Sequence, residues 1–116
     1  MKKLTLAAMA ATATLGVFAV TGTAEAAKPS FNCRYASNAA EITICQSNYL
    51  SRLDKNLAYW YGRAKLRASY FGQVGQLKSS EQAWIYERDA CGYDASCIAE
   101  STINRIEVLR RYATHV

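Results

Sequence analysis

The sequence contains only one proline, Pro29, and only one histidine, His115, among 116 residues. Proline interrupts helices, and the chain after Pro29 has no proline to end a helix. After Pro29 the apolar side chains recur at helical spacing, and no segment has the pattern of a β-strand. We therefore expect an all-α protein without a sheet.

The motifs of common enzyme classes are also missing. The chain has no Gly-x-Ser-x-Gly, no His-Glu-x-x-His and no glycine loop that would cradle a phosphate. His115 lies near the end of the chain, where no ordered helix would poise it for proton transfer. Carboxylates on short helices usually cap or face solvent, so we expect no catalytic residues, no enzymatic activity and no cofactor.

Residues 1–26 have the pattern of an export signal. Met1-Lys2-Lys3 is positively charged, residues 4–20 are largely apolar, and Ala24-Glu25-Ala26 has small residues at the cleavage positions. Residues 27–116 are then the expected mature protein, a single domain. Cys33 lies too far past the cut to be a lipidation site, and no second hydrophobic run follows. We expect a periplasmic or secreted protein with no stable membrane insertion after cleavage.

The four cysteines form two closely spaced pairs in a chain with an export signal. Four cysteines permit three pairings, but short loops and an oxidising compartment favour Cys33 with Cys45 and Cys91 with Cys97. Each such disulfide would stabilise the fold by about 2 to 3 kcal/mol. Zinc is the alternative, but intervals of eleven and five residues and a single histidine do not fit a metal site.

The chain carries a formal net charge of +5, and +4 remains once Lys2, Lys3 and Glu25 leave with the signal. Outside the cytoplasm the anions available to a basic protein are envelope polymers, lipid headgroups and acidic proteins. We expect no nucleic-acid partner, and a solvated charged surface is the simplest interpretation of the charge.

Helical periodicity and capping residues predict four helices. Their expected ranges are 39–46, 48–71, 76–90 and 95–112. We expect Ile42 and Cys45 to face inward in the first helix, and Phe71 to be the last residue of the apolar stripe of the second. Asn38, Ser47 and Asp94 are typical N-caps, while Gly72 and Gly92 suit helix ends. The expected fold is a small disulfide-stapled antiparallel helical bundle of three to four helices.

Several short motifs occur together and in order along nearly all of the mature chain. They are Ser30-Phe31-Asn32-Cys33, Glu41 with Ile44-Cys45, Leu50, Leu53-Asp54, Leu57, Tyr61, Gln82-Ala83-Trp84, Arg88-Asp89-Ala90-Cys91, Cys97-Ile98, Arg105-Ile106 and Leu109. In these motifs the chain resembles the LprI-type lysozyme inhibitor family. The resemblance implies a secreted or periplasmic helical domain that inhibits lysozyme. The protein after which the family is named looks like a lipoprotein, whereas this chain lacks the lipidation cysteine.

Three charged residues lie beside the predicted core. Asp54 flanks the apolar stripe of the longest helix, and Arg88 and Arg105 lie on helices expected to pack against it. We interpret them as a partly buried structural ion pair that fixes helix register. The functional alternative is a binding site.

A partner surface is predicted on the back of the longest helix. Tyr59, Arg63, Leu66 and Tyr70 lie opposite its apolar stripe, and tyrosine and arginine are enriched in interface hot spots. Gly62 on this helix suggests that another backbone approaches closely, either a neighbouring helix or a partner. The alternative is that another helix of the bundle covers this face.

Two functions fit these observations. The first is a protein that binds lysozyme and blocks its cleft. The second is a helical envelope module that binds another acidic protein or an anionic wall polymer, which suits the basic charge better.

Overall fold

The computed structural model describes residues 27–115, so the predicted export signal lies outside the described residues. One short 3-10 helix precedes four α-helices. These elements are η1 (Cys33–Tyr35), α2 (Ala39–Cys45), α3 (Asn48–Tyr70), α4 (Val74–Asp89) and α5 (Ala95–Thr114). No strand occurs among the described residues, which confirms the predicted all-α fold.

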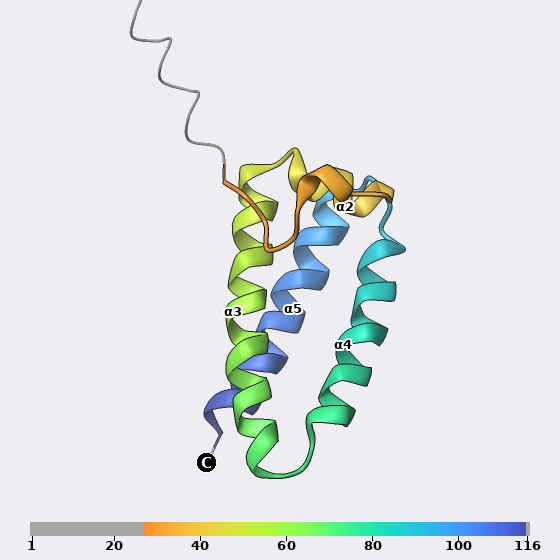
Figure 1. Cartoon of the computed structure of the whole chain (residues 1–116). Coiled ribbons are helices and arrows are strands. Elements are labelled where there is room, and N and C mark those ends of the chain that lie inside the picture. The colour runs from red at the N-terminus through yellow and green to blue at the C-terminus, as the bar shows by residue number, and fades with distance from the viewer. Residues whose placement is uncertain (1–26, 116) are drawn as a thin grey trace, which may run out of the picture.

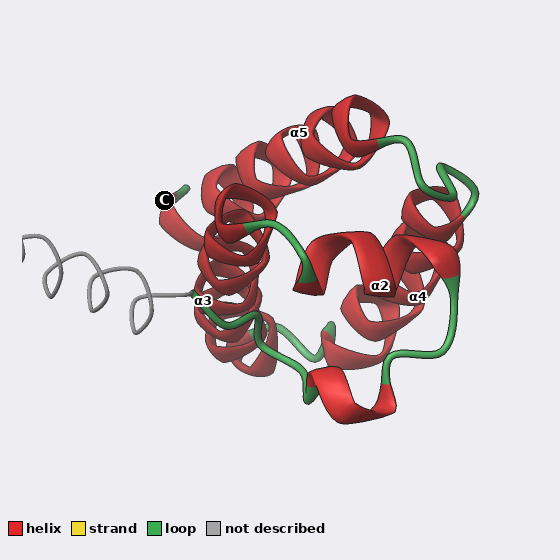
Figure 2. Cartoon of the chain, turned by 90° about the horizontal axis from the view of Figure 1, so that it is seen from above, coloured by secondary structure: helices red, strands yellow, loops and turns green. Residues whose placement is uncertain are grey.

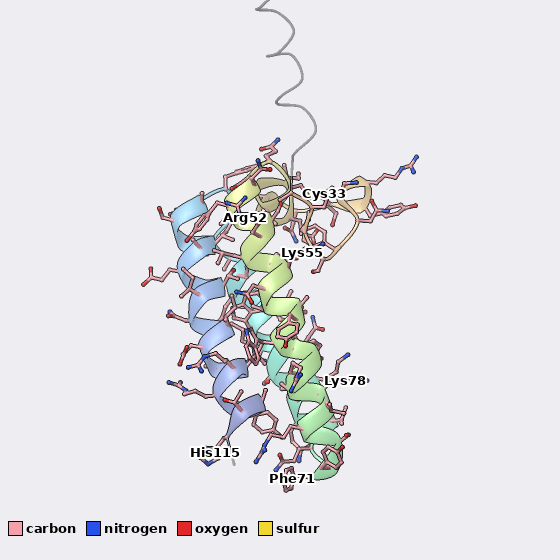
Figure 3. All side chains as sticks on the ribbon, turned by 90° about the vertical axis from the view of Figure 1, so that its left-hand side faces the viewer. Cys33, Arg52, Lys55, Phe71, Lys78 and His115 are labelled. Carbon is pink, nitrogen blue, oxygen red and sulfur yellow. A yellow bond between two sulfur atoms is a disulfide. The ribbon has the colours of Figure 1, made fainter. Side chains whose placement is uncertain are left out.

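The three long helices run side by side, each antiparallel to the one before it in the chain (Figure 1). The short helix α2 crosses one end of this bundle, as the view along the axis shows (Figure 2). We call this the disulfide end, because Cys33 and the turn between α4 and α5 also lie there (Figures 1 and 3). The opposite end, where α3 and α5 finish and α4 begins, is called the open end. Over residues 27–115 no helix combines the length and apolarity needed to span a bilayer.

The predicted N-caps are confirmed. Asn38 accepts a hydrogen bond from the backbone N–H of Glu41, and Ser47 and Asp94 cap α3 and α5 in the same way. The Glu41 side chain does not return to Asn38 but accepts a hydrogen bond from the backbone N–H of Ser37, at 2.8 Å. These side chains satisfy helix N–H groups that would otherwise lack acceptors.

Both predicted C-terminal glycines adopt the left-handed conformation that ends a helix. The backbone φ angle is 66° at Gly72 and 61° at Gly92. A residue with a Cβ atom is strained there, so glycine allows each sharp reversal between antiparallel helices.

The core consists of two apolar clusters along the bundle. Near the disulfide end the buried residues are Ala40, Ile44, Leu50 and Ile98. The second cluster contains Leu57, Ala64, Trp84 and Leu109. The stripes predicted on α3 and α5 supply most of these side chains.

Two details of the predicted core need correction. In α2 the buried side chains are Ala40 and Ile44, while Ile42 and Cys45, which were expected to face inward, are only half-buried. Phe71 was placed at the end of the α3 stripe but is 58 % exposed. It follows the last residue of α3, where the helix no longer directs its side chain toward α5.

A layer of buried polar side chains crosses the three long helices, and each member lies in sequence between residues that pack in the two apolar clusters. Asp54, Arg88 and Thr102 are each less than a tenth exposed, one from each long helix. Every fully buried side-chain nitrogen or oxygen among the described residues has a hydrogen-bond partner. The layer therefore avoids the penalty for an unsatisfied buried polar group.

Asp54 is buried, as expected, but its partner is not an arginine. Its carboxylate accepts hydrogen bonds from the backbone N–H and the side-chain hydroxyl of Ser30, at 2.6 and 2.5 Å. Arg88 pairs with Asp89, and Arg105 pairs with Glu81. The expected ion pair of Asp54 with Arg88 or Arg105 must therefore be corrected, because Arg88 pairs with the next residue of its own helix and Arg105 pairs with an acidic residue of α4.

The two predicted disulfides, Cys33–Cys45 and Cys91–Cys97, are confirmed. The first ties the segment before α2 to that helix, and the second clamps the turn between α4 and α5.

Replacing Cys33 and Cys45 together by alanine should lower the free energy of unfolding by about 3 kcal/mol, since a cross-linked loop of this length restricts the unfolded chain. Urea denaturation would measure the loss. Peptide mapping without reduction should recover only the two local links, and crossed links would contradict the fold.

Asp54 should stabilise the fold through its contact with Ser30. Because hydrogen bonds to a buried charged group contribute about 1.5 to 3 kcal/mol, Asp54→Ala should lower Tm by roughly 10 °C. Ser30→Ala keeps the backbone N–H donor and should cost about half as much. Calorimetry on both variants would test this. An unchanged Tm for Asp54→Ala, together with lost partner binding, would instead place Asp54 in a binding site.

Candidate functional site

The predicted partner surface lies open to solvent along the outer side of α3. Tyr59 and Leu66 are each 54 % exposed, Tyr70 is 77 % exposed, and Arg63 is also exposed. We call these four residues the α3 outer face. Their spacing of three or four residues puts them on one side of the helix, opposite the buried Leu57, Ala64 and Ala68. The alternative that another helix covers this face is excluded for the described residues.

Gly62 leaves a bare stretch of backbone within this face. A Cβ atom added at Gly62 would meet no atom within 4 Å apart from the helix itself. The described part of the chain therefore contains no neighbouring helix that would require glycine at this position. An exposed glycine inside a helix costs about 1 kcal/mol relative to alanine. The missing side chain leaves room for another molecule to approach the backbone closely.

A shallow depression adjoins the α3 outer face toward the open end. Arg63, Leu66 and Tyr70 line it together with Arg67, Phe71 and Ala113. The Arg67 guanidinium lies 5.1 Å from the centre of the Phe71 ring, which is a cation–π contact. Arg63 forms no ion pair within residues 27–115. The face therefore presents a guanidinium beside exposed apolar and aromatic groups.

Arg88 has a structural position at the disulfide end. Its guanidinium donates to the Asp89 carboxylate at 2.7 Å and lies 3.9 Å from the Glu41 carboxylate. Asn38, the N-cap of α2, donates to the same Asp89 side chain. Arg88 also lies over the ring of Trp84, 5.5 Å from its centre. The cluster fixes α2 against the end of α4 and leaves Arg88 with little exposed surface.

Arg105 forms a second internal ion pair, with Glu81. Its Nε donates to the Glu81 carboxylate at 3.0 Å, and its Nη2 donates to Ser80. Burial raises the pKa of Glu81 above its ordinary value, and the hydrogen bond and charge of Arg105 oppose that shift. Burial also raises the pKa of Tyr61, with the negative charge of Glu81 adding to the effect. Glu81 is therefore engaged by α5 and is not presented to a substrate as a hydrolytic acid.

A groove between α4 and α5 was not predicted from the sequence. Trp84 forms part of its wall, with Glu87 from α4 and Glu100 and Asn104 from α5. The α4 segment has no strong apolar stripe, so its packing face could not be read from periodicity. The sequence signal for this groove was Val108, an apolar residue that lies off the buried stripe of α5 and is exposed in the structure.

The turn between α4 and α5 projects from the disulfide end. Tyr93 is exposed in it, Asp94 caps α5, and Cys91–Cys97 closes the loop. No three His, Cys, Asp or Glu side chains gather as a metal site among the residues that the structure describes.

A comparison with protein families matches residues 32–109 to the family described as Lysozyme inhibitor LprI. Searches of curated proteins and of solved structures found no match. The matched segment contains both disulfides, the Asp54 and Arg88 positions and the whole α3 outer face. Because it covers more than half of the chain, and the fold has the helices and cysteine links expected of such a domain, this chain belongs to the LprI family of lysozyme inhibitors.

Proposed function

We propose that this protein inhibits lysozyme by placing the α3 outer face over the lysozyme cleft. Lysozyme cleaves glycosidic bonds with two carboxyl groups in an open cleft. A rigid protein can block the reaction by covering that cleft and donating hydrogen bonds to the acids. The observation that carries this proposal is the exposure of Tyr59, Leu66 and Tyr70 around Arg63, which has no ion-pair partner within residues 27–115.

Arg63 supplies the donor that a carboxylate cleft requires. Its planar guanidinium can donate two parallel hydrogen bonds to one carboxylate, a stronger interaction than a single neutral hydrogen bond. Tyr59 and Leu66, one turn away on either side, would exclude water around that contact. Such an arrangement is typical of hot spots, in which a central charged or aromatic group is surrounded by contacts that keep solvent out.

Gly62 supports the same assignment. The missing side chain beside Arg63 lets the wall of a cleft reach the α3 backbone, since no atom of the described chain fills that space. The helix itself is held by its buried face, with Ala64 and Ala68 fully covered. A surface fixed in this way loses little conformational entropy when it binds.

We also propose that the protein acts outside the cytoplasm, in the periplasm or after secretion. Two disulfides fit an oxidising compartment, and lysozyme acts on the cell wall from outside. The predicted export signal supports the same location.

Replacing Tyr59 and Arg63 together by alanine should weaken inhibition tenfold or more in a wall-lysis assay. A tenfold loss corresponds to about 1.4 kcal/mol, which is within the range of hot-spot residues. Tyr35→Ala with Arg34→Ala is a matched control, because it removes the same two residue types from exposed positions in η1. It should inhibit like the wild type.

Two results would contradict the proposal in different ways. Full inhibition by the Tyr59 and Arg63 variant would exclude the α3 outer face and direct attention to the Tyr93 turn. No inhibition by the correctly folded wild type would exclude the function itself. Circular dichroism on each variant separates lost binding from lost fold.

The charge of the protein predicts how association with lysozyme depends on salt. Animal-type lysozymes are basic, and the mature domain is expected to be basic too, so their net charges repel at long range. Raising the salt concentration from about 0.05 to 0.3 M should therefore speed association, because the Debye length falls well below about 10 Å. Stopped-flow or surface-based kinetics would measure this rate. A steep loss of binding with salt would contradict a close-packed protein interface and favour an anionic polymer as the partner.

A further inference from the structure

A second concave surface lies at the open end. It shares Arg67 and Phe71 with the depression beside the α3 outer face but contains none of the four residues of that face. It is formed where α3 and α5 finish and α4 begins, and Figure 3 labels Phe71 and His115 at this end of the molecule. The pocket is lined by Arg67, Phe71, Gln73, Arg111, Tyr112 and His115. Its volume of about 400 Å³ is enough for a phosphoryl group and part of the alcohol to which it is esterified.

The polar groups of this pocket are mainly donors, and no carboxylate lines it. Arg67 comes from α3 and Arg111 from α5, so two arginines from different helices line the same pocket. The Phe71 ring lies against the Arg67 guanidinium at 5.1 Å and limits its movement. Two arginines in one pocket suit an anion with several oxygen atoms more than they suit a single carboxylate.

The positive charge of Arg111 is only weakly compensated. Its side chain is 66 % exposed and lies 3.8 Å from the Glu107 carboxylate. Arg110 lies much closer to that carboxylate, at 2.6 Å, and its hydrogen bond lowers the pKa of Glu107. Arg110 and Arg111 thus share one ion-pair partner, Glu107. Arg67 forms no ion pair among the described residues.

The start of α4 adds to the positive potential at this end. Gln73 occupies its N-cap position, yet its side chain makes no capping hydrogen bond, and the first turn contains no acidic residue. Gln73 instead accepts a hydrogen bond from the Tyr112 hydroxyl. This contact joins the α3–α4 turn to α5 within the lining of the pocket. Helix α4 therefore begins next to a residue of the pocket and has no side-chain acceptor for its positive end.

Stabilisation of helix ends explains only part of this arrangement. Arginines in the last turns of α3 and α5 interact favourably with the negative ends of those helix dipoles. That effect requires neither a concave aromatic wall nor an uncapped α4. Within residues 27–115, the paired arginines, the aromatic wall and the uncapped helix start occur together only at the open end. The other helices α2, α3 and α5 all begin with a capping side chain.

We propose that the Arg67–Arg111 pocket binds the phosphate group of a phosphate ester. This site is additional to lysozyme inhibition and does not depend on it. Phosphate esters occur outside the cytoplasm in anionic wall polymers, in lipid headgroups and in small solutes, and the same pocket chemistry would recognise each of them.

Titration of the isotope-labelled protein, followed by amide NMR, would test the site with three probes. The probes are glycerol 3-phosphate, poly(glycerol phosphate) and vesicles of phosphatidylglycerol with phosphatidylcholine. At least one should give saturable changes confined to residues near 67–76 and 110–115. Arg67→Gln and Arg111→Gln should each weaken that binding about tenfold. Arg52→Gln is the matched control, because it removes the same charge near the opposite end of α3 (Figure 3), and it should change the affinity less than twofold.

Several outcomes would overturn the site. They are no saturable change with any of the three probes, an equal loss for Arg52→Gln and Arg111→Gln, or acetate binding as tightly as glycerol 3-phosphate. Binding of only the vesicles or only the polymer would support the site and identify its source of phosphate. Arg111 is outside the α3 outer face and largely exposed, so Arg111→Gln should fold normally and keep full lysozyme inhibition. Failure of the pocket and failure of inhibition can therefore be distinguished.

Discussion

Ala64 and Ala68 are fully buried on the inner side of α3, where this helix makes its most extensive contact, with α5. Because alanine has no side-chain atom beyond Cβ, the two helices can pack closely along this line, and Leu57 and Leu109 fill the space beside it. The other elements are arranged around this pair. Helix α2 closes one end, and α4 packs less extensively against both partners. The α3–α5 contact also leaves the opposite side of α3 uncovered, which is the condition for the proposed partner surface.

The polar layer gives the bundle its register. Arg88 is nearly covered, and Asp89 and Glu41 are its ion-pair partners. Sliding α4 by one turn would move the Arg88 guanidinium toward an apolar cluster and separate it from Glu41 on α2, and it would break the hydrogen bond from Asn38 to Asp89. Loss of a partner for a buried charge costs several kcal/mol. An apolar core alone would discriminate less sharply between the native position of α4 and a position shifted by one turn. Glu81 and Arg105 constrain α4 against α5 in the same way, farther from the disulfide end.

Local features of this fold could be predicted because they depend on neighbouring residues. Asn38, Ser47 and Asp94 cap helices a few residues away, and Gly92 reverses the chain within a disulfide loop that is itself short. The partner of Asp54 could not be predicted in this way. Ser30 lies 24 residues earlier, in a segment that is neither helix nor strand, and its position depends on how that segment returns across α3. The charge pairs of α4 likewise depend on helix rotation, which sequence spacing alone does not determine. The exposure of the α3 outer face followed from periodicity, whereas the pockets at α4 required the three-dimensional arrangement.

Both disulfides lie toward the same end of the molecule, which has a consequence for its dynamics. The covalent links restrain α2 and the α4–α5 turn, while the α3–α4 turn is held by noncovalent contacts such as that between Tyr112 and Gln73. Local opening should therefore require less free energy toward the α3–α4 turn, and amide protection should decline in that direction along the helices. A molecule that bound at the less restrained end would raise the opening free energy there. The gradient of local stability would then depend on occupancy, while the covalently linked end remained unchanged.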